Sequence, residues 1–149
     1  MKSTLAAACV LLAIALGACQ SAAESPRAEQ RPPVPAQARR VPSNGGRYVV
    51  AFVPDPDPWP VNQPVTLTVW VLDHDGKGAP IPPGKVTLAV DAAMPEHQHG
   101  MTTEPVVHAN AGCFSVSGML LHMPGHWQLY FDVTRDGITE RAQCDVTLE

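Results

Sequence analysis

The stretch PVTLTVWVLD, residues 64–73, alternates apolar and polar side chains over its first half and is rich in β-branched residues. Alternation with a period of two places successive side chains on opposite faces of a β-strand. A proline opens the run and an Asp-His-Asp-Gly turn signal closes it, which limits it to the length of one strand. The segment therefore predicts a strand with one face in a hydrophobic core. That face carries Val65, Leu67, Val69 and Val71.

Similar runs recur on both sides of this strand, separated by clusters of Pro, Gly, Asn and Asp, and no helical period lasts ten residues after residue 44. Seven short strands in roughly a hundred residues predict an all-β fold, an immunoglobulin-like β-sandwich of about seven strands. The run EPVVHA is the weakest of them. The other six predicted strands are 47–53, 85–91, 104–109, 113–122, 127–134 and 138–148.

Two runs near the C-terminus supply further core residues by the same alternation. Their opposite faces carry Ser, Gln and Asp, which suit solvent. The predicted core residues are Phe114, Val116 and Leu120 in the first run, and Trp127, Leu129, Phe131 and Val133 in the second.

The N-terminus has the features of an export signal: a positive residue, then an apolar run too short to span a bilayer, then small residues. The run ends in LGAC, residues 16–19, which resembles the bacterial lipobox, in which the cysteine is lipidated after cleavage. We expect residues 1–18 to be a lipoprotein signal peptide and Cys19 to carry the membrane anchor, with an ordinary signal peptide as the alternative. Gln20 favours attachment to the outer membrane, facing the periplasm.

The segment 19–44 is rich in Pro, Ala, Gln and Arg and has almost no large apolar residue. Such a composition cannot bury enough apolar surface to fold. The sequence therefore predicts a lipidated, Pro-rich flexible tether over 19–44 and a folded domain over 45–149.

The composition of residues 45–149 argues against two classes of function. Five basic residues against twelve acidic ones leave no electrostatic footprint for nucleic acid. The sequence has no nucleophile elbow, no phosphate-binding glycine loop and no CxxC pair. We therefore expect a protein that is not an enzyme and does not bind nucleic acid.

The stretch MPEHQHGM, residues 94–101, places two Met and two His directly after a predicted strand, and the turn LHMPGH, residues 121–126, adds another His and Met. Thioethers select Cu(I), whereas imidazole binds Cu(I), Cu(II) and zinc, so the mixed set indicates copper. The alternative is that Met94 closes the end of the core and the histidines form an ordinary polar turn. The predicted copper ligands are Met94, His97, His99, Met101, His122 and Met123.

This site depends on whether residues 104–109 form a strand. If they do, the chain folds back and the two turns lie at the same end of the sandwich; otherwise they lie at opposite ends. His74 and His108 are predicted to face solvent, outside the site.

Cys113 and Cys144 remain once the export signal and the anchor are set aside. Two cysteines in an oxidising compartment favour a disulfide. If the last three strands form a meander, however, the two residues lie near opposite ends, beyond the roughly 7 Å limit for bridged Cα atoms. The pairing stays open. The inward parity of Cys144 predicts a small buried hydrophobe, with a soft metal ligand as the alternative.

The segments AAMPEHQHGM, residues 92–101, and GCFSVSGMLLHMPGHWQLYFDV, residues 112–133, together resemble the YtkA-like/FixH-like family of exported β-sandwich domains. The resemblance implies an immunoglobulin-like fold, copper delivery or oxidase assembly, and the six ligands given above. The lipobox and tether depart from the transmembrane helix of FixH-like proteins. We expect a cell-envelope lipoprotein that binds copper and exchanges it with a donor or acceptor protein; the alternative is a metal-free protein-interaction module.

Overall fold

The computed structural model describes residues 33–149. The predicted signal peptide, the lipidation site Cys19 and the first part of the predicted tether lie outside the described residues. Within residues 33–149, no helix is long and apolar enough to cross a membrane.

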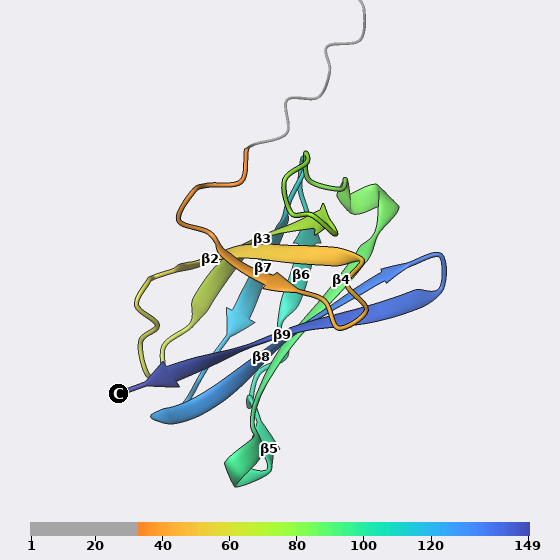
Figure 1. The fold of residues 1–149 in the computed structure, drawn as a ribbon. Helices are drawn as coiled ribbons and strands as arrows, with labels where there is room; N and C mark the ends of the chain where they lie inside the picture. The colour runs from red at the N-terminus through yellow and green to blue at the C-terminus, as the bar shows by residue number, and fades with distance from the viewer. Residues whose placement is uncertain (1–32) are drawn as a thin grey trace, which may run out of the picture.

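Two antiparallel sheets pack face to face in the described part of the chain (Figure 1). The first has the strand order β1-β2-β3-β7-β6, and the second has the order β5-β4-β8-β9. Two 3-10 turns, η1 (Pro83–Lys85) and η2 (Pro95–His97), flank β4. The strands are β1 (Arg39–Pro42), β2 (Tyr48–Asp55), β3 (Val65–Asp73), β4 (Thr87–Met94), β5 (His99–Gly100), β6 (Val106–Ala109), β7 (Phe114–Met119), β8 (Gly125–Arg135) and β9 (Ile138–Leu148).

The predicted all-β sandwich is confirmed, and all seven predicted strands form, as β2, β3, β4, β6, β7, β8 and β9. The structure adds two short strands. The four-residue β1 pairs with β2, and the two-residue β5 pairs with the end of β4. Neither is long enough to show an alternating pattern, so neither could be predicted from the residue pattern.

The sheet begins earlier than the predicted domain boundary at residue 45. Strand β1 lies within the segment predicted to be a tether, and its Val41 joins the core between the sheets. Ala38, just before it, packs with Trp70 and Leu72 on the outer face of the first sheet. Strand β1 could not be predicted from composition, because an edge strand is held by backbone hydrogen bonds to its neighbour and needs few apolar side chains of its own.

The core follows the predicted alternation with one exception. The inward residues predicted for β3 and β8 are buried, as are Phe114 and Val116 in β7. Leu120, however, is partly exposed, and Met119 and Leu121 are buried instead. The reason is a register shift between β3 and β7, with Gly118 in the left-handed region at φ 82°. The extra residue of such a bulge reverses the parity of every residue that follows it.

The last three strands do not form the meander considered above, because the chain crosses from the first sheet to the second between β7 and β8. Cys113 packs against the Trp70–Leu72 cluster outside the first sheet, whereas Cys144 on β9 packs against the core between the sheets. Both thiols are free. Burial raises the pKa of Cys144 to about 11, as expected of a small apolar side chain rather than of a reactive thiolate.

A buried carboxylate ties the chain after β1 to β9. Glu140 accepts hydrogen bonds from Ser43 Oγ at 2.6 Å and from the Arg47 amide at 3.1 Å, and it pairs with Arg47 Nε at 3.0 Å. Gly45 passes so close that a Cβ there would collide with this carboxylate. The Ser43 hydrogen bond is the main cause of a lowered pKa for Glu140.

This lowered pKa predicts an acid-dependent loss of stability. The ionised Glu140 contributes its full stabilisation above its unfolded pKa of about 4.5, and the contribution disappears as the pH falls through the lower folded pKa. Glu140→Gln should therefore lower the free energy of unfolding at pH 7 by more than it does at pH 3. Urea unfolding at both pH values measures this. The exposed Glu96→Gln is the control, and an equal loss at both pH values for Glu140→Gln would contradict the prediction.

Candidate metal site

The weak predicted strand 104–109 does fold back, and this decides where the two Met/His turns lie. Strand β6 pairs with β7 in the register Val106↔Ser117 to Ala109↔Phe114. As a result, the turn after β4 and the turn after β7 lie at the same end of the sandwich. Figure 1 shows β5 and the adjoining turn projecting at that end, at the bottom of the view.

The first turn is built so that it returns the chain along β4. Pro95 starts the 3-10 turn, and Gln98 closes it in the left-handed conformation at φ 56°, with its amide donating to the Pro95 carbonyl. The chain then pairs back as β5, with His99 directly opposite Met94. Residues directly opposite in an antiparallel pair have their side chains on the same face. His99 therefore shares the face of the buried Met94.

Three imidazoles come together across the two turns. The ring centroids of His99 and His122 are 5.2 Å apart, and those of His97 and His99 are 5.8 Å apart. Two imidazoles that share one metal, each with its nitrogen about 2.0–2.1 Å from the ion, have centroids roughly 5–6 Å apart. The structure thus brings His99 and His122, which are far apart in sequence, to a separation suited to one ion.

The ring nitrogens of the central pair differ in what they bind. His99 Nδ1 lies 3.2 Å from the Gly100 carbonyl oxygen, to which it donates in the tautomer that keeps the lone pair of Nε2 available for a metal. Metal-ligating histidines commonly hold their second nitrogen in this way. His122 Nδ1 is buried and has no hydrogen-bond partner. Such an orphaned polar atom carries a desolvation cost that a bound cation would remove.

The methionines next to this pair in sequence or in strand pairing lie at different depths. Met94 is only 1 % exposed and belongs to the core, and a Cβ on Gly125 would lie 2.7 Å from its Cε. Gly125, with φ 126°, therefore lets the second turn lie directly on the end of Met94. Met123, in that turn, is partly buried against the same core. Met94 thus closes the core, as the alternative interpretation predicted, and also lies beside His99.

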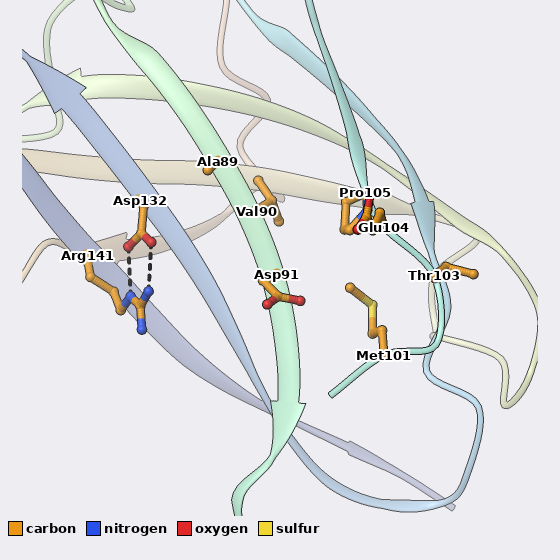
Figure 2. A pocket seen from close by; sticks show the side chains of 9 residues that line it. All are labelled: Ala89, Val90, Asp91, Met101, Thr103, Glu104, Pro105, Asp132 and Arg141. Carbon is orange, nitrogen blue, oxygen red and sulfur yellow. Dashed lines mark hydrogen bonds and ion pairs between the residues drawn. The ribbon is translucent and has the colours of Figure 1, made fainter. Parts of the chain in front are cut away.

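Met101 lies to one side of the histidines. It lines a pocket of about 510 Å³ between β4 and the segment 103–105, and Figure 2 shows its side chain pointing toward Asp91. On the far side of this pocket, Arg141 forms a bidentate ion pair with Asp132, with both N···O distances 2.7 Å. Met101 therefore lines this pocket, and it also packs partly buried against the core between the sheets.

The remaining histidines are separate from the site. His74 and His108 are exposed, as predicted. His126 follows the second turn, but its Nε2 lies 3.3 Å from Asp145 Oδ1 of β9. Because the adjacent Trp127 points into the core, His126 faces the opposite side of the sheet.

The sequence prediction missed Trp127 as part of this site and assigned it to the core alone. The indole is fully buried, and its centroid lies 5.4 Å from that of His122 and 5.9 Å from that of His99. Its Nε1 donates to the Met123 carbonyl at 3.0 Å. The available signal was its position at the start of the strand that follows the Met-Pro-Gly turn.

Within residues 33–149, no group of three or more His, Cys, Asp or Glu side chains is arranged to hold a metal ion. The candidate site therefore consists of the His99–His122 imidazole pair with thioethers near it. Harder ions such as zinc usually recruit further His, Cys or carboxylate ligands.

No protein-family model, curated protein sequence or solved structure matches this chain. The resemblance to YtkA-like and FixH-like domains accordingly stays a prediction.

Proposed function

We propose that this protein is a cell-envelope lipoprotein whose β-sandwich binds one copper ion for copper handling or cuproenzyme assembly. The observation that carries the proposal is the His99–His122 pair, with ring centroids 5.2 Å apart and with the buried His122 Nδ1 left without a hydrogen bond. A ligand nitrogen that is buried and unpaired in the metal-free protein is already desolvated for binding.

The donors available favour copper over zinc. Met94 lies opposite His99 in the β4–β5 pair and Met123 directly follows His122, and their thioethers are soft, neutral ligands suited to Cu(I). His97 is exposed at the tip of the turn, 5.8 Å from His99 between ring centroids, where it can reach an arriving ion. Met101 lines the neighbouring pocket beside β4 and supplies a further thioether close in sequence to His99.

The export signal and lipobox support a role at the membrane surface facing the periplasm. A lipid anchor on Cys19 would hold the domain near the membrane, where a donor or acceptor protein could exchange copper with it. The exposed position of His97 suits such an exchange, because a ligand at the rim can be replaced by one from a partner without opening the core.

Copper content gives the direct test. The purified protein, loaded with Cu(I) under reducing conditions and then desalted, should retain about one copper ion per chain. A variant in which His97, His99 and Met101 are all replaced by alanine should retain little copper. Elemental analysis measures both.

A matched variant with His74 and His108 replaced by alanine loses the same number of imidazoles as the test variant and should bind copper normally, since both residues are exposed and outside the two turns. Equal copper retention by the wild type and the triple variant would refute the proposal. A wild-type protein that retains no copper would instead favour the metal-free interaction module.

A further inference from the structure

We infer that Trp127 is a positioning and selectivity residue of the proposed copper site, and that it favours a soft monovalent cation, Cu(I) or Ag(I), over a divalent ion. This inference rests on the proposed function and adds the class of ion that the site selects. The Trp127 indole contacts three parts of the site, namely His99, His122 and the Met123 carbonyl.

The indole is the common neighbour of both paired imidazoles. Its plane is inclined at 79° to the His122 ring and at 71° to the His99 ring, with centroids 5.4 and 5.9 Å away. Both rings therefore meet Trp127 in a T-shaped arrangement. An ion bound by both His99 and His122 would have this buried aromatic ring beside it.

The same side chain fixes the second turn. Trp127 Nε1 donates to the Met123 carbonyl at 3.0 Å, whereas Nε1 of Trp59 and Nε1 of Trp70 are buried without a partner. The sequence contains three tryptophans, so Trp127 is the one whose indole N–H holds a neighbouring segment. This bond sets where the Met123 backbone lies relative to the imidazole pair.

An aromatic wall discriminates between ions by charge density. An indole face attracts a cation within about 6 Å, most strongly where water is excluded, but it supplies no lone pair. A divalent ion such as Cu(II) or Zn(II) needs nitrogen, oxygen or thiolate donors on the side that the indole occupies. Cu(I) and Ag(I) accept a few soft ligands and lose less hydration on entering such a site. Trp127 therefore favours the monovalent ions.

The test uses Ag(I), a redox-inert probe of the Cu(I) site, with variants of the full chain. Trp127→Phe keeps an aromatic ring but removes the N–H donor and weakens the cation attraction. Its affinity for Ag(I), measured by competition with a chelator, should fall about tenfold, while its affinity for Zn(II) should change less than about twofold. Trp59→Phe is the matched control and should bind Ag(I) as the wild type does.

A second variant tests the contact without altering Trp127. In the double variant Trp59→Phe/Trp70→Phe, Trp127 is the only remaining tryptophan of the three in the sequence. Stoichiometric Ag(I) should quench its fluorescence emission. The same addition should leave the emission of Trp127→Phe unchanged. A merely structural role for Trp127 would not produce this spectroscopic signature.

The outcomes separate the inference from the proposed function. If Ag(I) binds to the double variant without changing its emission, or if Trp127→Phe loses Ag(I) and Zn(II) affinity equally, the inference is overturned while copper binding stands. If the wild type binds neither Ag(I) nor Cu(I), the proposed function fails and the inference fails with it.

Discussion

Replacing His122 with phenylalanine is expected to lower the affinity for Cu(I) by roughly a hundredfold and, at the same time, to make the metal-free protein more stable. Loss of a residue that only supports a metal ligand commonly lowers metal affinity by about 10–100-fold. Loss of a direct ligand is expected to lie at the upper end of that range. Phenylalanine keeps an aromatic ring against His99 and Trp127 but removes the buried, unpartnered Nδ1. Relief of that desolvation cost should raise the free energy of unfolding by about 1 kcal/mol.

The two halves of this prediction are measured separately, by competition with a Cu(I) chelator and by urea unfolding of the metal-free protein. His108→Phe is the control, because His108 is exposed on β6 and away from the pair. A His122→Phe variant that keeps wild-type Cu(I) affinity would contradict the assignment of His122 as a ligand.

A chain shortened to residues 43–149 should be less stable than residues 33–149 by about 2–4 kcal/mol, since burying a valine side chain contributes about 1.5–3 kcal/mol and burying a further methyl-sized group about 0.8 kcal/mol. The shortening removes β1 with its buried Val41, and it removes Ala38 from the Trp70–Leu72 cluster. Small domains have total stabilities of about 5–15 kcal/mol, so a loss of this size is large. The Ser43–Glu140 hydrogen bond is retained, which confines the change to β1 and the segment before it.

The comparison is made by urea unfolding of the two chains, with the intermediate chain 39–149 as a control. That chain keeps the β1–β2 pairing and should recover most of the difference. Equal urea midpoints for residues 43–149 and 33–149 would mean that β1 adds nothing to the fold and that the domain begins where the composition suggested.

Much of the candidate site could be predicted from the sequence because its donors are chemically distinctive. Met and His are concentrated in two short turns, and the alternation of the neighbouring strands identified where those turns begin. The prediction that the two turns meet depended on residues 104–109 forming a strand, and they do, as β6. The directions of the side chains could not be predicted. Met101 points into a pocket toward Asp91, while the core residue Trp127 contacts both imidazoles.

The predictions about the fold that were wrong share one physical origin. Each concerns a feature that depends on pairing between strands rather than on the residue pattern within one strand. Leu120 has the same parity as the buried Phe114 and Val116, which predicted that it would be buried too. The bulge at Gly118, however, moves the residues after it to the opposite face of the sheet. Val41 is one apolar residue in a polar segment, and its burial follows from the pairing of β1 with β2. The crossing of the chain between sheets after β7 likewise leaves no mark on the residues of β7 or β8 themselves.

By itself, the sequence determined the all-β architecture and the composition of the two Met/His turns, since a period of two and the softness of a donor atom are properties of the residues. Only the tertiary structure decided that His99 and His122 face one another over Trp127, leaving His122 Nδ1 buried without a partner. That arrangement requires β5 to pair back on β4 and the chain to cross between the sheets after β7. Contacts between residues more than twenty positions apart arise from this pairing, and no local pattern encodes it.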